Sequence, residues 1–284
     1  MQLVDSHGHL QTRPFATDAS EVLEAARAAG VVRLLAAGFD GPTSHAGIAF
    51  ARAHPGVDTS VGVHPHVAAD VDDAGWRGLM ALATDPTVVA LGETGLDYDR
   101  GFSPREAQLR NLRRHLEQAW ERRLPVILHC RSRSGERDAQ DELLRELATA
   151  GVGETPWRAR LGDRPPAVLH SFSGPVDYAE RALAMGCAVS FSGLVFRRGE
   201  EVSAEVAALV PDDLLLTETD SPYLSPPGAS RRRNEPRWVE ITARWLAERR
   251  GVDPDALGSV LVAAYDRFVG RGERSADGRA QQVD

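Results

Sequence analysis

The sequence predicts an α/β protein built as a single closed (β/α)8 barrel, followed by extra helices at its C-terminal end. Two observations lead to this fold class. Eight short apolar runs alternate with longer helical stretches, and no change of composition marks a linker between two domains. Strands that alternate with helices pair in parallel through right-handed crossovers, and 284 residues suffice for eight such units. A doubly wound open sheet is the alternative, although no Gly-x-Gly-x-x-Gly turn follows the first strand.

The predicted strands are short runs in which β-branched and other apolar residues predominate. They cover residues 2–6, 31–37, 58–63, 88–92, 125–129, 167–170, 188–191 and 213–217. The predicted helices between them cover residues 19–29, 44–53, 74–83, 104–122, 137–150, 176–184 and 203–209, and helices 236–249 and 253–268 follow the last strand. Thr43 and the pair Ser103-Pro104 are typical helix starts, while Gly30 and Gly186 are typical ends.

Two segments stand outside this alternation. Residues 151–166 are rich in Gly, Pro and Arg, and they predict an irregular inserted loop. Residues 271–284 are polar, and we expect a flexible tail there. The barrel is therefore predicted to span residues 1–270.

The composition excludes several classes of function. No apolar run is long enough for a membrane span, no secretory signal is recognisable, and two cysteines are too few for a disulfide scaffold, which favours the cytoplasm. The net charge of −8 has the wrong sign for a protein that coats nucleic acid, and nothing indicates an obligate protein partner. All 33 basic residues are Arg, so mechanisms that need a Schiff-base, P-loop or metal-bridging lysine are closed.

The side chains that carry chemistry follow the predicted strands at one end. The first strand leads into His7 and His9, which share one side of an extended chain because they are two residues apart. The later strand ends supply His64, His66, Glu93, His129, His170, Glu218 and Asp220. Because the carboxyl ends of the strands in a (β/α)8 barrel open on one face, and that face carries the chemistry, we expect these residues to meet there.

Six of these residues are candidate metal ligands: His7, His9, Glu93, His129, His170 and Asp220. Four imidazoles and two carboxylates are too many for one tetrahedral site with an open position. They suit two divalent ions about 3.5–4 Å apart that share a bridging carboxylate and a bridging water. Glu93 is the expected bridge because the chain has no Lys, and the mixed donors fit Zn, Mn, Fe or Co, with Mg still open.

Seven motifs run in order through most of the chain. They are Asp5-Ser-His-Gly-His-Leu10, Gly62-Val-His-Pro-His66, Leu91-Gly-Glu-Thr-Gly-Leu-Asp-Tyr98, Leu128-His-Cys-Arg131, His170-Ser-Phe-Ser-Gly174, Glu218-Thr-Asp-Ser-Pro-Tyr-Leu224 and Arg233-Asn-Glu-Pro236. With them the chain resembles the TatD family of metal-dependent deoxyribonucleases, which are amidohydrolase-like barrels, and the family pattern implies the same six ligands. Gly8 and Ser171 stand where family members often carry Cys, and the last helix lacks the Asn common there. The interval from His129 to His170 is longer than usual for the family, which implies that residues 151–166 are an insertion near the mouth of the barrel, the end at which the carboxyl ends of the strands open. These departures bear on substrate preference more than on metal binding.

The resemblance implies hydrolysis of phosphodiester bonds in DNA or a short oligonucleotide. In this hypothesis Asp220 orients the attacking water and accepts its proton, while His64 bonds the phosphate or protonates the leaving oxygen. Arg131 and Arg233 are expected to bind substrate phosphates, with a salt-bridged loop clamp as the alternative for residues 231–236.

Several other residues receive supporting interpretations. Glu218, Asp5 and Asp97 are expected to orient ligand histidines, with loop capping as the alternative for the two aspartates, and His66 is interpreted as structural. Tyr223 and Phe172 are candidates for stacking on a base, with packing as the alternative. Cys130 is expected to be inert, and His45, His54 and His115 are assigned to the surface or to packing.

Two other functions stay open. Related barrels hydrolyse amide, ester or lactone bonds, and the same pair of ions would serve attack on a carbonyl. The second alternative is a metal-binding quality-control protein with low activity.

Overall fold

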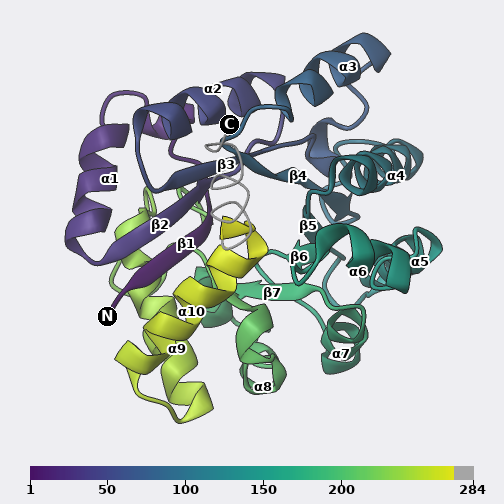
Figure 1. Cartoon of the computed structure of the whole chain (residues 1–284). Coiled ribbons are helices and arrows are strands. Elements are labelled where there is room, and N and C mark those ends of the chain that lie inside the picture. Colours follow the sequence, from purple (N-terminus) through teal and green to yellow (C-terminus); the bar gives the residue numbers. More distant parts are fainter. Residues whose placement is uncertain (272–284) are drawn as a thin grey trace, which may run out of the picture.

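The computed structural model describes residues 1–271, and it confirms the predicted fold class. Eight parallel strands follow one another in the order β1 to β8, with the helices arranged around them (Figure 1). This sequential order is that of a barrel, because a doubly wound sheet reverses its strand order partway across.

The strands are β1 (Leu3–Gly8), β2 (Val31–Ala36), β3 (Val57–Val61), β4 (Val88–Asp97), β5 (Val126–Arg131), β6 (Ala167–Leu169), β7 (Ala188–Phe191) and β8 (Leu215–Thr217). The α-helices are α1 (Ala19–Ala28), α2 (Gly41–Ala53), α3 (Asp73–Leu82), α4 (Arg105–Arg122), α5 (Asp138–Thr149), α6 (Thr155–Leu161), α7 (Val176–Ala184), α8 (Ser203–Leu209), α9 (Val239–Arg250) and α10 (Pro254–Phe268). Short 3-10 helices are η1 (Arg13–Phe15), η2 (Pro65–Val67), η3 (Gly193–Phe196), η4 (Asp212–Leu214) and η5 (Pro236–Trp238).

The barrel closes between β1 and the segment that follows β8. The backbone N–H of His9 donates to the carbonyl of Ser221 at 2.8 Å, and the N–H of Asp220 donates to the carbonyl of His7 at 2.9 Å. The hydroxyl of Thr217 adds a bond of 3.0 Å to the carbonyl of Val4. These contacts bring the first and last predicted ligands together, although more than 200 residues separate them in the chain.

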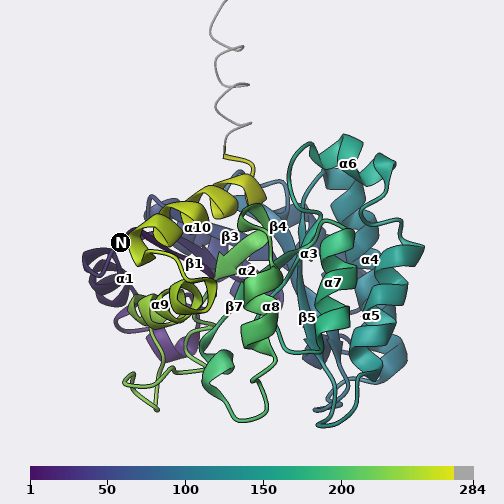
Figure 2. The same cartoon turned by 90° about the horizontal axis from the view of Figure 1, so that it is seen from below.

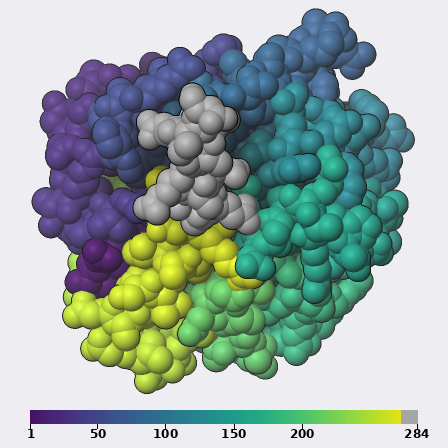
Figure 3. Space-filling view, viewed as in Figure 1, coloured from purple at the N-terminus to yellow at the C-terminus, as the bar shows by residue number. Residues whose placement is uncertain are grey.

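The amino-terminal end of the barrel is covered by α10, which lies across the strands in Figure 1 and fills the lower centre of the surface in Figure 3. The buried Tyr265 of α10 donates its hydroxyl to Asp58 of β3 at 2.8 Å. Arg271 also binds Asp58, at 2.6 and 2.8 Å. The remaining residues of the predicted tail, 272–284, lie outside the described residues.

The prediction for residues 151–166 is wrong in two respects. The segment contains a helix, α6, and it connects α5 to β6. A helix-to-strand connection returns the chain to the amino end of the next strand, so this insertion lies opposite the mouth. Figure 2 shows α6 at the upper end of the molecule, away from the lower loops that follow β7 and β8. Within residues 1–271, no helix is both long and apolar enough to cross a membrane.

Candidate metal centre

Glu93 joins the predicted ligands at the mouth of the barrel. Its Oε2 lies 3.3 Å from Nε2 of His7. Its Oε1 lies 2.9 Å from Nε2 of His170 and 3.2 Å from Nδ1 of His129. The two oxygens of one buried carboxylate thus face two different groups of nitrogen donors.

The first group lies between the ends of β1 and β8. Nε2 of His7 and Nε2 of His9 are 3.3 Å apart, and Oδ1 of Asp220 lies 3.3 Å from Nε2 of His9. The ring of His9 is oriented by its Nδ1, which bonds to the carbonyl of Ala37 at 2.9 Å. Asp220 reaches the group through a left-handed backbone conformation with φ of 53°, so its approach does not follow from simple strand alternation.

The donor spacing fits metal ions. Tetrahedral ligands at 2.0–2.2 Å from an ion lie about 3.4 Å from one another. The pairs His7–His9, His7–Glu93 and His9–Asp220 are each separated by 3.3 Å. Nδ1 of His129 and Nε2 of His170 are 3.4 Å apart. Buried carboxylates are paired or coordinate metals, and the neutral imidazoles beside them are the commonest metal ligands, so this set of donors suits a cation.

Two glycines allow Glu93 to enter the mouth. Gly92 has φ of +118°, a value that other residues rarely adopt. A Cβ atom on Gly62 would lie 2.4 Å from the Cα of Gly92, so the end of β3 contacts β4 directly beneath Glu93. The N–H of Glu93 donates to the carbonyl of Gly38 at 2.7 Å and fixes the turn. Burial tends to raise the pKa of Glu93, but the imidazoles of His64 and His170 outweigh it and hold that pKa well below its usual range.

Carboxylates also stand behind the candidate ligands. Nδ1 of His170 lies 3.1 Å from Oε1 of Glu218, whose other oxygen accepts a bond from Ser190. Nε2 of His129 lies 3.2 Å from Oδ2 of Asp97. Such contacts fix the tautomer and the ring orientation of a ligand histidine.

Asp5 is bound mainly to Thr219, at 2.6 and 2.8 Å, with a longer contact of 3.4 Å to the N–H of His7. Burial raises the pKa of Asp5 to about 8. Asp5 therefore ties β1 to the segment after β8 and orients no ligand ring.

His64 and His66 lie on the side of Glu93 that faces His129. Nε2 of His64 is 3.1 Å from Oε1 of Glu93, and its Nδ1 accepts the backbone N–H of His66 at 3.1 Å. Because Nδ1 is an acceptor, the neutral ring carries its proton on Nε2 and donates toward Glu93. Nε2 of His66 lies 2.7 Å from Oδ2 of Asp97, so His66 and His129 share one carboxylate oxygen.

The two arginines expected to bind substrate are both paired. The side chain of Arg131, at the end of β5, is exposed at the rim and lies 3.1 Å from Asp99. Arg233 binds Asp18 at 2.8 and 2.9 Å and Glu235 at 3.0 Å. These contacts favour the salt-bridged clamp for Arg233, and they leave Arg131 available to exchange an exposed carboxylate for a phosphate.

The two aromatic side chains expected near a base lie in different environments. The suggestion for Phe172 is wrong, because this side chain is 2% exposed and packs against Tyr178 and Phe191 in the core. Tyr223 is exposed beside His9, with ring centroids 6.2 Å apart.

The histidines outside the strand ends take the places expected for them. His115 is buried in α4, where it accepts the N–H of Val63 and contacts the carbonyl of Asn111. Burial lowers its pKa to about 3, which keeps the ring neutral. His45 is exposed and His54 partly buried, both at the outer layer of the barrel.

Two residues around the site do not stand out in the sequence: Phe102 and Ser190. Phe102 lies in the β4–α4 connection, with its ring centroid 4.8 Å from that of His66. In the sequence, the one indication for Phe102 is its position shortly after the motif that ends in Leu-Asp-Tyr98 and contains the candidate ligand Glu93.

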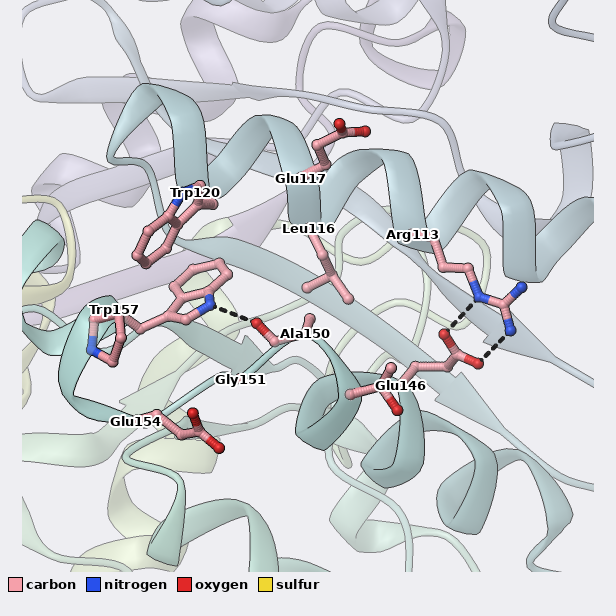
Figure 4. A pocket seen from close by; sticks show the side chains of 11 residues that line it. Arg113, Leu116, Glu117, Trp120, Glu146, Ala150, Gly151, Glu154 and Trp157 are labelled. Carbon is pink, nitrogen blue, oxygen red and sulfur yellow. Dashed lines mark hydrogen bonds and ion pairs between the residues drawn. The ribbon is translucent and has the colours of Figure 1, made fainter.

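A separate cavity of about 480 Å³ lies on the outer layer, between α4, α5 and α6 (Figure 4). Trp120 and Trp157 line one side, and the Arg113–Glu146 ion pair lies at the other. Trp157 donates its indole N–H to the carbonyl of Ala150 at 2.9 Å. These contacts hold the insertion against the barrel, away from the candidate ligands.

The chain is similar to known proteins over most of its length. Residues 4–270 match the family described as TatD related DNase. The 3'-5' ssDNA/RNA exonuclease TatD of Erwinia billingiae is 38% identical over 257 residues, which cover 88% of this chain and 92% of that protein. The uncharacterized metal-dependent hydrolase YabD of Bacillus subtilis is 31% identical over 269 residues, with 94% and 98% covered. The crystal structure of YjjV, a TatD homolog from Escherichia coli K12, has a TM-score of 0.80 at 26% identity, covering 94% of this chain and 97% of that one.

Proposed function

The chain belongs to the TatD related DNase family and is a metal-dependent hydrolase, and from this premise we propose that it shortens single-stranded DNA or RNA from the 3′ end. The names of the exonuclease relatives support the substrate and the polarity. The observation that carries the proposal is the position of Glu93, whose two oxygens face separate groups of donors at the open end of the barrel.

We propose two divalent cations, Mg, Mn or Zn, at this centre. His7, His9 and Asp220 would hold one, His129 and His170 the other, and Glu93 would reach both. When bound, such a pair lowers the pKa of water and offsets charge on phosphate oxygens. The proposal is supported by the spacing of the donors and by the carboxylates behind His129 and His170.

We propose that three residues of the chain supply proton transfer and phosphate binding. Asp220 is the proposed proton acceptor because its carboxylate lies at the mouth and reaches solvent, with its side chain 14% exposed. His64 carries its proton on Nε2 and would donate a hydrogen bond to a phosphate oxygen beside Glu93. Arg131 would bind a phosphate at the rim in place of Asp99.

We place the activity in the cytoplasm, because Cys130 and Cys187 are both unpaired. Burial also raises the pKa of Cys187 to about 12, which keeps this thiol unreactive.

Labelled oligonucleotides test the function. Purified protein is incubated with Mg, Mn or Zn and with single-stranded DNA or RNA labelled at either the 5′ or the 3′ end. A 5′ label should give a ladder that shortens stepwise, a 3′ label should give mononucleotide at once, and EDTA should abolish both. Turnover of simple esters or lactones without nucleotide release would replace this function with carbonyl hydrolysis.

The His129→Ala variant separates the site from a contaminating nuclease. It should lose metal and activity together while keeping the circular dichroism spectrum of a folded barrel. Normal activity in this variant would contradict the proposed centre.

A further inference from the structure

Two exposed aromatic side chains stand at the mouth of the barrel. Among the aromatic residues of the described chain, only Phe102 and Tyr223 are exposed, at 67% and 58%. The others are buried or partly buried. Phe102 lies in the β4–α4 connection and Tyr223 in the β8–α9 connection, so both belong to loops that follow strands. An exposed aromatic ring in such a loop offers a face on which a nucleic-acid base can stack.

The contacts of the two rings lead to different oxygens of Glu93. On one path, Tyr223 contacts His9 with ring centroids 6.2 Å apart, and Nε2 of His9 lies 3.9 Å from Oε2 of Glu93. The other path leads from Oε1 of Glu93 to His64, from His64 to His66 and from His66 to Phe102. The first step is 3.1 Å between atoms, and the next two ring centroid separations are 4.2 and 4.8 Å. A phosphodiester held at Glu93 would therefore have an exposed ring at the end of each path.

Both rings stand on backbone that is held in place. Asn234 is fully buried and donates to the carbonyls of Thr219 and Tyr223 at 2.9 and 2.7 Å. Beside Phe102, the hydroxyl of Ser103 donates to the carbonyl of His66 at 2.9 Å. Aromatic platforms fixed in advance lose little conformational entropy when a base stacks on them.

A cavity of about 640 Å³ lies between the loops that follow β7 and β8. It is lined by Phe196 and Arg197 from the loop after β7, and by residues 225–229 and Arg231 from the loop after β8. The two loops touch, because a Cβ on Gly193 would lie 1.9 Å from the carbonyl oxygen of Leu224. Loops after the seventh and eighth strands are frequent phosphate sites in such barrels.

Part of the unpaired positive charge of this acidic protein lies at the same end. Six arginines in loops that follow strands are exposed and make no ion pair with the described residues: Arg13, Arg133, Arg197, Arg198, Arg231 and Arg232. Most other arginines are paired with carboxylates, as Arg233 is with Asp18. An anionic chain is therefore the occupant that the charge of this end fits.

We propose that Phe102 and Tyr223 are base platforms that hold consecutive bases of a single strand on either side of the scissile phosphodiester. The strand continues beyond Tyr223 into the Arg197–Arg231 cavity, where its phosphates bind. This inference rests on the proposed nuclease function and deepens it, since it assigns the residues that select a single strand. Paired bases stack within a duplex and offer no free face to an aromatic ring, whereas single-stranded bases do.

The test is a double-mutant cycle, in which an aromatic side chain and a base of the substrate are removed separately and together. kcat/KM is measured on a single-stranded 12-mer and on the same 12-mer with one base at a time replaced by an abasic tetrahydrofuran unit near the 3′ end. Phe102→Ala and Tyr223→Ala should each lower kcat/KM on the normal strand by about 5- to 150-fold, the effect of losing one base–aromatic stack. Each variant should have the same kcat/KM as the wild-type protein on the one substrate that lacks the base stacked on the altered ring. The missing bases of these two substrates should be neighbours in the strand. Phe102→Tyr and Tyr223→Phe should keep the wild-type kcat/KM, because each variant retains an aromatic ring.

The cavity is tested by the salt dependence of binding to the strand in EDTA. Arg197→Ala and Arg231→Ala should each reduce the slope of log K against log salt by about 0.7 for each phosphate that the variant no longer binds. Arg123→Ala, at the opposite end of the barrel, and Leu209→Ala, an exposed apolar side chain at the end of α8, are the matched controls and should change neither measurement.

Two results overturn the inference and differ from each other. In the first, the protein digests single strands, but the alanine variants keep the wild-type kcat/KM or lose the same factor in kcat/KM on every abasic substrate. This result refutes the base platforms and leaves the proposed nuclease function in place. In the second, the wild-type protein digests neither DNA nor RNA, which refutes both the proposed function and the base platforms.

Discussion

Oδ2 of Asp97 lies 3.2 Å from Nε2 of His129, while the other ring nitrogen of His129 faces Glu93 at 3.2 Å. A carboxylate behind a ligand histidine holds the ring in one tautomer and raises its basicity. The buried Asp97 is itself fixed, since its Oδ1 accepts the N–H groups of Asp99 and Arg100 at 3.1 and 2.8 Å.

Asp97→Asn should keep the shape of this contact and remove its charge. We expect metal affinity or kcat/KM to fall by about 10- to 100-fold, the usual effect of losing such a partner, with the fold retained. Glu218→Gln is the matched variant, because Glu218 stands behind His170 in the same way. Isothermal titration calorimetry with the metal ion measures the metal affinity of both variants. Unchanged metal affinity in both would show that neither carboxylate supports a ligand.

Glu93→Gln tests the bridge between the two donor groups. The amide keeps one oxygen, so one of the two groups loses its shared carboxylate donor. We expect the number of bound ions per chain to fall, and activity to fall by more than the ~100-fold expected of an orienting residue. Elemental analysis after dialysis measures the first quantity, and two tightly held ions in this variant would exclude a bridging role.

Removal of the metal should also lower stability. An ion that binds only the folded barrel adds about 2.7 kcal/mol to the free energy of unfolding when its concentration is 100 times its Kd. Urea unfolding with and without Mn in the protein stripped by EDTA measures this difference. The gain should be smaller in Asp220→Asn, and an equal gain in that variant would place the stabilising ion elsewhere.

Tyr265→Phe tests the contact that holds α10 across the amino-terminal end. The variant removes the hydroxyl that donates to buried Asp58 at 2.8 Å, while Arg271 still binds the carboxylate. We expect the free energy of unfolding to fall by about 1 kcal/mol, with kcat/KM unchanged because the mouth lies at the other end. A change in kcat/KM without a change in stability would contradict this assignment.

Arg233→Ala distinguishes a loop clamp from a substrate contact. Its guanidinium bonds Asp18 and Glu235 and lies 4.8 Å from the ring of Phe15, so the clamp predicts a loss of about 0.5–1 kcal/mol of stability. KM for single-stranded DNA should change little. A large rise in KM with unchanged stability would assign Arg233 to the substrate.

Sequence alone determined which residues follow each strand, because alternation along the chain and the shared mouth of a (β/α)8 barrel are local and topological rules. His7, His9, Glu93, His129, His170 and Asp220 were chosen on this basis, and the structure brings them together. Their roles as metal ligands stay predictions.

Tertiary structure alone decided the contacts between distant segments. The pairing of Arg233 with Asp18 spans 215 residues, and Phe172 turns into the core although His170, two residues before it, faces Glu93 at the mouth. No local pattern encodes such choices, because they depend on which partner occupies the neighbouring volume and charge. The same reason explains Glu93: its position follows from the strand that carries it, but the direction of its two oxygens follows from the imidazoles packed on either side.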